Sequence, residues 1–133
     1  MIGLDTNVLV RYLARDDEPQ AAAAAAVLEG LGDRETAFVS QIVLCELWWV
    51  LGTAFHSPAE ERAAILETLL TTRGIVVEAA DAVRAALTAT ARGADFADAL
   101  ITQASARAGC AATVTFDRRA ATAAGMRLLE AGA

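Results

Sequence analysis

The stretch Ala37-Phe-Val-Ser40-Gln-Ile-Val-Leu-Cys-Glu46-Leu-Trp-Trp-Val-Leu51 contains the pattern on which the fold depends. The short apolar run Ala37–Val39 has no polar alternation, which predicts a strand buried on both faces, as in a parallel sheet. Ser40 predicts a helix N-cap, and the apolar residues after it predict a helix that carries Glu46 about a turn and a half from its start. Repeated strand-then-helix units of this kind are typical of α/β domains.

The same unit recurs along the whole chain. Further strands are predicted at Ile2–Leu4, Ile75–Val77, Ala112–Thr115 and Arg127–Leu129. Further helices are predicted at Val8–Ala14, Ala21–Leu31, Pro58–Leu70, Ala80–Thr90, Phe96–Ala108 and Arg118–Ala124. The helix Pro58–Leu70 is predicted to begin with a capping box, Ser57-Pro-Ala-Glu60. No repeat or linker interrupts the pattern. We therefore expect one α/β domain over residues 1–133, with a short central parallel sheet of about five strands and helices on both of its faces.

Composition excludes several classes of protein. Alanine raises the mean hydropathy to +0.41, but no run reaches the roughly 18 apolar residues that a membrane-spanning helix needs. The first ten residues lack the basic and apolar regions of a signal peptide. Cys45 and Cys110 are too few for a disulfide framework and predict small buried hydrophobic residues in a reducing compartment. We therefore expect a cytoplasmic protein without a membrane anchor.

The charged residues narrow the chemistry further. Eleven basic and 17 acidic residues give a net charge of −6, which argues against a nucleic-acid partner unless bound metal reverses the local field. All 11 basic residues are arginine, so a Schiff-base lysine and a phosphate-binding P-loop are both excluded. His56 is the one histidine, which excludes a zinc triad.

Four acids stand in or directly after apolar segments, and they are Asp5, Glu46, Asp98 and Asp117. A carboxylate in such a place is costly to bury unless a positive charge neutralises it. In open parallel sheets, functional sites form at the carboxyl ends of the strands. We therefore expect these acids to converge there on a hard divalent cation, which prefers oxygen ligands.

Each acid also has a purely structural interpretation. Asp5 and Asp117 can be helix caps, where aspartate is favoured. Asp95 can be the N-cap of a helix that has Asp98 in its first turn. Glu46 can lie on the solvent face of its helix. The residues alone leave both interpretations open.

The chain resembles PIN-domain ribonucleases, and in particular the VapC-type toxins of bacterial toxin–antitoxin modules. The resemblance covers nearly the whole chain and agrees with the family in order and spacing. The stretches that carry it are Ile2-Gly-Leu-Asp5-Thr6-Asn7-Val-Leu-Val-Arg11, Val39-Ser40 before Glu46, Ala94-Asp95-Phe-Ala-Asp98-Ala-Leu-Ile101 and Thr113-Val-Thr115-Phe-Asp117-Arg118.

The resemblance implies metal-dependent hydrolysis of RNA phosphodiester bonds. Asp5, Glu46, Asp98 and Asp117 would form an acidic quartet that holds one or two Mg²⁺ or Mn²⁺ ions. Around them, Thr6, Asn7, Ser40 and Thr115 would hydrogen-bond the carboxylates or the scissile phosphate.

The expected partners are RNA, an antitoxin protein and a second copy of the chain. Four arginines near the predicted site either bind RNA phosphates or form a solvated face, and they are Arg11, Arg15, Arg118 and Arg119. Trp48 and Trp49 point about 100° apart on a helix, so one is expected inside and the other in an exposed groove for the antitoxin. Alternatively, both tryptophans fill one side of a helix layer.

Two rival functions remain. A phosphate-transfer protein would need a lysine, which the chain lacks, or a second aspartate on the first strand. A catalytically idle PIN-like binding module would usually have lost one or more of the four acids. We therefore expect a Mg²⁺- or Mn²⁺-dependent endoribonuclease that acts as a toxin.

Overall fold

The computed structural model describes residues 1–132, and in that range five short strands alternate with seven helices. Backbone contacts divide the chain into two compact units, Met1–Glu78 and Ala79–Ala133. The α/β class and the parallel pairing of the strands are confirmed. None of the helices in the described range has the length and apolar character that crossing a bilayer requires.

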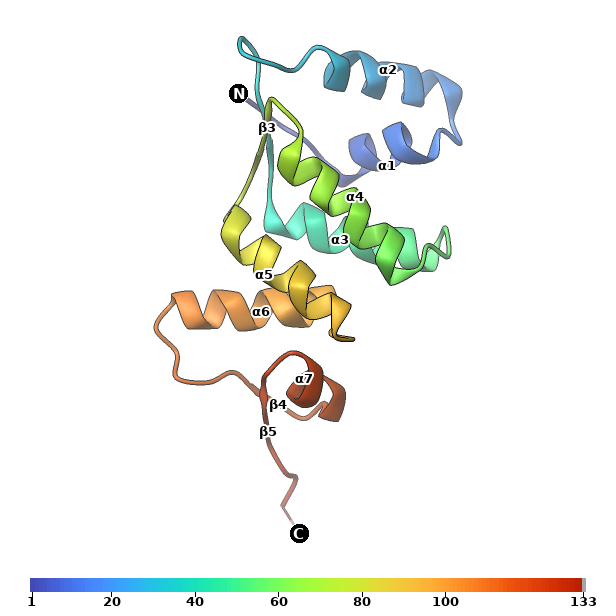
Figure 1. Cartoon of the computed structure of the whole chain (residues 1–133). Coiled ribbons are helices and arrows are strands. Elements are labelled where there is room, and N and C mark those ends of the chain that lie inside the picture. The colour runs from blue at the N-terminus through green and yellow to red at the C-terminus, as the bar shows by residue number, and fades with distance from the viewer. Residues whose placement is uncertain (133) are drawn as a thin grey trace. The chain divides into compact units, whose positions relative to one another are not determined.

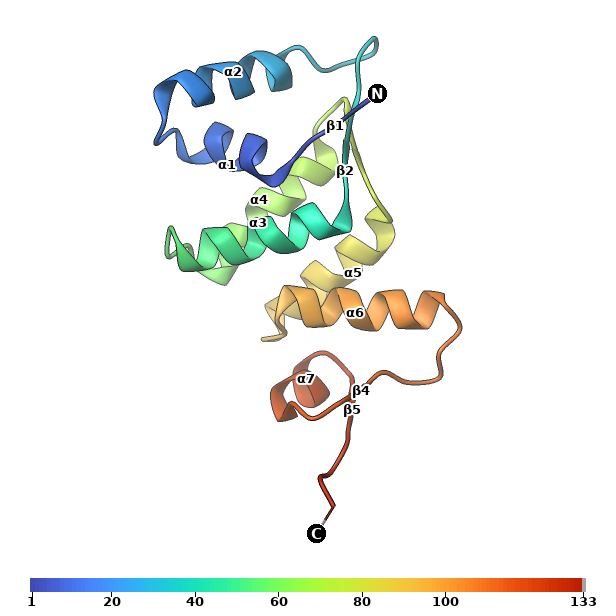
Figure 2. The ribbon, with the colours of Figure 1, turned by 180° about the vertical axis from the view of Figure 1, so that it is seen from behind.

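The first unit is a three-stranded parallel sheet with four helices. Its elements in chain order are β1 (Ile2–Gly3), α1 (Thr6–Ala14), α2 (Glu18–Glu29), β2 (Ala37–Val39), α3 (Gln41–Thr53), α4 (Ala59–Thr71) and β3 (Ile75–Val77). The strands lie in the order β1-β2-β3, so both crossovers step in the same direction. Parallel crossovers are almost always right-handed, and two in one direction place their helices on one side of the sheet. Figures 1 and 2 show α1 to α4 on that one side of the strands.

The exposure of the strand residues agrees with this one-sided packing. Ala37 and Val39 of β2 are fully buried. Phe38 lies between them in the strand, so its side chain belongs to the opposite face of the sheet. Its register partner on β3 is Val76, which is 42% exposed. The helices of the first unit thus lie on one face of its sheet, and helices on both faces of the sheet stay a prediction for the whole domain.

Helix α3 is the centre of the first unit, because it packs against both α1 and α4. Leu44 and Leu47 of α3 are almost completely buried, as is Leu9 of α1. The alanine-rich helix α2 buries Ala21 and Ala24 along one face, and this narrow face allows it to lie close against α1. The alanine tract is therefore a packed helix, as its propensity predicts.

The second unit contains α5 (Ala80–Ala91), α6 (Phe96–Arg107), β4 (Val114–Thr115), α7 (Arg118–Ala123) and β5 (Arg127–Leu128). Helices α5 and α6 pack against each other around the fully buried side chains of Val83 and Phe96. Strands β4 and β5 form their own parallel pair. The prediction of one central sheet of about five strands is therefore wrong: the strands form a sheet of three and a sheet of two. Strands of two or three residues offer few ladder hydrogen bonds, so apolar runs alone do not determine how they pair.

Two local predictions also need correction. Helix α4 has Pro58 as its N-cap residue, and the Ser57 hydroxyl donates to the Glu61 carboxylate at 3.2 Å, so the capping box with Glu60 does not form. Cys45 is half-buried and Cys110 is exposed. Cys110 follows the turn at Gly109, where φ is +94°, and this turn places it outside the core.

Candidate functional site

The side chain of Asp5 does not cap α1, although the position of Asp5 predicts a helix cap. It is the N-cap residue of α1, directly after the first strand, yet its side chain accepts no hydrogen bond from the helix. Its carboxylate is exposed to solvent. The cap interpretation of Asp5 is therefore wrong, and both of its oxygens are available to a ligand.

Thr6 joins the first helix to Glu46 of α3. The buried Thr6 hydroxyl donates a hydrogen bond of 2.9 Å to Glu46 Oε1, across 40 positions of sequence. This bond holds one carboxylate oxygen in place and leaves the other open to solvent or a ligand. Asp5, Thr6 and Glu46 therefore gather at the point where α1 begins beside α3. Asn7 is exposed beside them.

Two caps anchor the start of α3, the helix that carries Glu46. Ser40 Oγ accepts a hydrogen bond from the backbone N–H of Val43 at 3.2 Å, so its predicted role as a cap is confirmed. Glu78 Oε1 accepts from the backbone N–H of Gln41 at 2.8 Å. A carboxylate at this end of a helix is also favoured by the helix dipole.

In the second unit, Asp95, Asp98 and Asp117 form a cluster of negative charge. Asp95 Oδ2 accepts from the backbone N–H of Asp98 at 3.3 Å and is the N-cap of α6, as expected. Asp117 Oδ1 accepts from the backbone N–H groups of Arg119 and Ala120, at 2.8 and 3.3 Å. The cap interpretation of Asp117 is thus correct, but its second oxygen makes no cap bond. Thr115 Oγ1 accepts from the Asp117 N–H at 3.0 Å and shapes the turn after β4.

The Asp98 carboxyl has a perturbed acidity. Burial raises its pKa above the ordinary value, and the neighbouring carboxylates of Asp95 and Asp117 raise it further, while Arg119 opposes them. Each of these causes except Arg119 disfavours the ionised form. A cation at this cluster would relieve the repulsion.

The predicted acids are divided between the two units, two in each. Asp5 and Glu46 belong to the first unit, and Asp98 and Asp117 belong to the second. Within residues 1–132, no three Asp, Glu, His or Cys side chains stand close enough together to surround a metal ion. The convergence of all four acids on one site stays a prediction.

The family assignment follows from comparison with known proteins. The PIN domain family matches residues 2–126. The chain belongs to the PIN-domain family. PIN domains are in general nucleases that use divalent metal ions, and the matched residues include all four acids. Comparison with curated proteins gave no match for this PIN domain.

The predicted arginines of the PIN domain differ in how they are held. Arg11 pairs with Asp16 at 2.9 Å, and Arg119 donates to the Gly93 carbonyl through Nε and Nη2, at 3.3 and 3.2 Å. Arg15 lies over the Tyr12 ring, 5.9 Å from its centroid. Arg118 is exposed. Arg119 is the one of these four that also acts electrostatically on Asp98.

The two tryptophans of α3 have different environments. Trp48 is 5% exposed, whereas Trp49 is 66% exposed. The guanidinium of Arg62 lies 4.4 Å above the Trp48 ring, and Arg62 Nη1 donates to the Trp48 carbonyl at 3.3 Å. Trp48 is therefore a core residue of the PIN domain, and a partner surface on α3 can include Trp49 but not Trp48.

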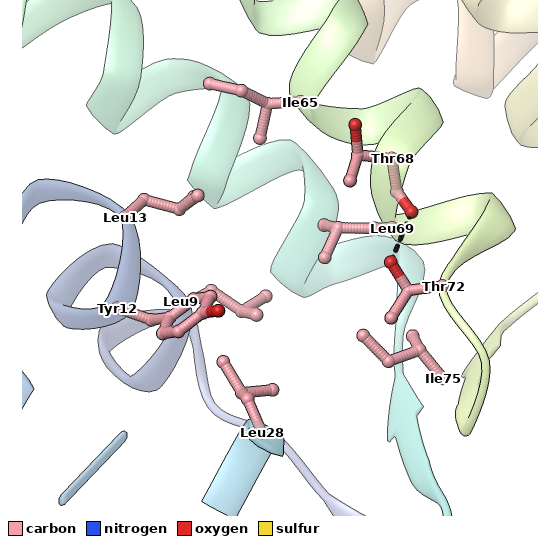
Figure 3. Close-up of a pocket in the computed structure, with 9 residues that line it drawn as sticks. All are labelled: Leu9, Tyr12, Leu13, Leu28, Ile65, Thr68, Leu69, Thr72 and Ile75. Carbon is pink, nitrogen blue, oxygen red and sulfur yellow. Dashed lines mark hydrogen bonds between the residues drawn. The ribbon is translucent and has the colours of Figure 1, made fainter. Parts of the chain in front are cut away.

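An apolar pocket of about 240 Å³ opens beside α1 and α4 (Figure 3). It is lined by Leu9, Tyr12, Leu13, Leu28, Ile65, Thr68, Leu69, Thr72 and Ile75. The hydroxyls of Thr68 and Thr72 both donate to backbone carbonyls of α4, at 2.9 and 2.6 Å. No carboxylate or arginine lines this pocket, so it supplies no metal ligand.

Sequence reasoning missed two residues that contact α3, the helix that carries Glu46. Glu78 directly follows the strand Ile75–Val77, and this position after a strand is the same signal that identified Asp5 and Asp117. Arg62 gives no such signal, because its contact with Trp48 is made across two helices. Only the packing of α3 against α4 brings this pair together.

Proposed function

We propose that this PIN domain is a Mg²⁺- or Mn²⁺-dependent endoribonuclease that hydrolyses RNA phosphodiester bonds. Asp5, Glu46, Asp98 and Asp117 would together hold one or two metal ions. We further propose that the protein is the cytoplasmic toxin of a type II toxin–antitoxin pair and acts as a homodimer.

The observation that carries this proposal is that none of the four acids forms an ion pair within the described residues. In the range 1–132, the ion pairs join Glu35, Asp16, Asp33 and Asp81 to positive groups, and none of them includes a predicted metal ligand. The Asp98 carboxyl is nevertheless partly buried, with its pKa raised. Carboxylates that repel one another and form no ion pair favour binding of a metal cation.

The donor set fits a hard divalent ion. All four side chains offer carboxylate oxygens, which Mg²⁺ and Mn²⁺ prefer. When bound, such an ion activates water and stabilises the negative charge that develops on phosphate oxygens. The protein's own groups then hold the ligands: Thr6 fixes one oxygen of Glu46, and the α7 backbone fixes one oxygen of Asp117.

The toxin role is supported by exposed apolar residues on α3. Ile42 and Trp49 of α3 are 73% and 66% exposed, an apolar surface that favours a protein partner. By resemblance to the family, this partner would be an antitoxin. Growth arrest on expression of the protein, relieved by the small protein encoded beside it, would support this role. Unchanged growth during expression of active protein would contradict it.

Cleavage of total cellular RNA tests the nuclease proposal. Purified protein is incubated with RNA in Mg²⁺, in Mn²⁺ and in EDTA, together with Asp5→Asn and with Asp81→Asn as a matched control. Asp81 is an exposed acid in the first turn of α5 and pairs with Arg84. We expect discrete fragments that vanish with EDTA and with Asp5→Asn but persist with Asp81→Asn. Intact RNA in every arm, from folded protein, would favour an idle binding module.

A further inference from the structure

A second pocket in the first unit has a different chemical character from the apolar one. It lies between α1 and α2 and has a volume of about 370 Å³. The residues that line it are Asn7, Val8 and Arg11 from α1 and Gln20, Ala23, Ala24 and Val27 from α2. We call this pocket the α1–α2 groove. Its volume falls within the roughly 300–1,000 Å³ of pockets that hold small organic molecules.

One side of the α1–α2 groove is apolar. Val27 is 40% exposed and Val8 is half-buried, so both offer methyl groups to a ligand. Ala23 and Ala24 leave the groove open, because longer side chains at these positions of α2 would fill it. The apolar face of a flat ring can pack against such a surface.

The other side of the groove carries a fixed set of hydrogen-bond donors. Arg11 Nε donates to Gln20 Oε1 at 2.6 Å, and Arg11 Nη1 donates to Asp16 Oδ1 at 2.9 Å. These two bonds hold the guanidinium and leave Nη2 for a ligand. Gln20 Oε1 already accepts one bond from Arg11, and the two amide N–H donors of Gln20 are left for a ligand. Asn7 adds a side-chain amide that is exposed at the same groove.

The groove begins next to the candidate site. Asn7 follows Asp5 by two residues and lies in the first turn of α1. Thr6, between them, holds Glu46. A nucleotide whose phosphate lies at Asp5 and Glu46 therefore has the α1–α2 groove, which begins at Asn7, close by for its base.

We propose that the α1–α2 groove binds one unpaired base of the RNA substrate and so selects the cleavage sequence. This inference rests on the proposed nuclease function. Proteins read single-stranded RNA largely by hydrogen-bonding the exposed edges of unpaired bases. Arginine and amide N–H donors match a base edge with two adjacent acceptors, and guanine presents O6 and N7 in this way. The preferred base is therefore guanine.

Binding to inactive protein tests the groove without relying on catalysis. The Asp5→Asn variant is titrated with a short oligouridine that contains one central guanosine, and with the same oligomer containing adenosine instead. We expect tighter binding of the guanosine oligomer by about tenfold, the discrimination that one pair of well-placed base contacts provides. Adding Gln20→Glu, which replaces the amide donor by an acceptor, should abolish this preference. Equal affinity for both oligomers would overturn the proposal.

Filling the groove gives the second test. Ala23→Met places a long side chain in the groove, and Ala22→Met is the matched control, since Ala22 is exposed on α2 but does not line the groove. For each variant, the rate of RNA cleavage is divided by the rate of hydrolysis of bis(p-nitrophenyl) phosphate, which has no base. We expect Ala23→Met to lower this ratio by about tenfold or more and Ala22→Met to leave it unchanged.

The outcomes separate the two proposals. Activity on both substrates with an unchanged ratio in Ala23→Met would overturn the groove alone. A lowered ratio with unaltered cleavage positions would show that the groove binds the RNA backbone, and this also contradicts base selection. Wild-type protein that is folded but hydrolyses neither substrate would overturn the nuclease proposal, while the binding experiment still decides the groove.

Discussion

Replacing Thr6 by valine should weaken the link between α1 and the helix that carries Glu46. Valine has nearly the shape of threonine, so the buried site, which is 7% exposed, stays filled. The change removes the hydrogen bond of 2.9 Å to Glu46 Oε1. A hydrogen bond to a charged group contributes roughly 1.5–3 kcal/mol, and water reaching the exposed Glu46 reduces the loss. We expect a lower free energy of unfolding by about 1 kcal/mol.

A double-mutant cycle isolates this bond from the other effects of each substitution. Urea unfolding is measured for wild type, Thr6→Val, Glu46→Ala and the double variant. The comparison requires that the free energy of unfolding has the same slope against urea concentration in all four proteins. We expect a coupling energy of about 1 kcal/mol between the two positions. Thr68→Val is the matched control, because the Thr68 hydroxyl donates to the Ala64 carbonyl within α4 and should show no coupling to Glu46.

The same variant connects stability to the site. If Thr6 orients Glu46 for a metal ion, Thr6→Val should also lower the affinity for Mn²⁺ by about tenfold, as is usual for partners of metal ligands. Strict additivity in the unfolding cycle would show that the hydrogen bond contributes nothing in solution. Unchanged Mn²⁺ affinity together with clear coupling would show that the hydrogen bond stabilises the fold but does not orient Glu46 for a metal ion.

Three further predictions follow from the structure. In metal-free protein, Asp98→Asn should stabilise the fold near pH 7, because the folded state raises the pKa of Asp98 and so disfavours its ionised form. This gain should vanish below the ordinary value of 3.8, where the carboxyl is protonated in both states, and urea unfolding across pH checks it. Trp48→Ala should cost about 3–5 kcal/mol, because it empties a core position, whereas Trp49→Ala should stay within about 0.5 kcal/mol; equal losses would contradict the different burial of the two rings. Mn²⁺ at about 100 times its dissociation constant should stabilise the wild type by about 2.7 kcal/mol and Asp5→Asn by much less; a melting temperature that does not respond to metal would contradict a site at these acids.

Local patterns predicted the elements of this PIN domain well. The strands Ala37–Val39 and Ile75–Val77 have the predicted bounds, and α5 and α6 differ from prediction by one residue at one end. These elements depend on neighbours in sequence: β-branched runs, caps such as Ser40, and glycine turns. The pairing of the strands was not predictable in this way. Apolar runs of similar composition do not encode which run lies beside which, so the division into sheets of three and two strands appeared only in the structure.

For the candidate site, the sequence predicted four acids and a divalent cation as their ligand, and both stay predictions. Each stands after a strand or in a helix, in or beside an apolar run, and this prediction depended only on the local pattern. The tertiary structure decided what each side chain does: Asp5 is uncapped, Asp117 is a cap, Trp48 is buried and Trp49 is not. It also joined residues far apart in the chain, as Glu78 to the start of α3 and Arg119 to Gly93. Such contacts depend on the packing of whole helices, and the sequence near either residue does not predict them.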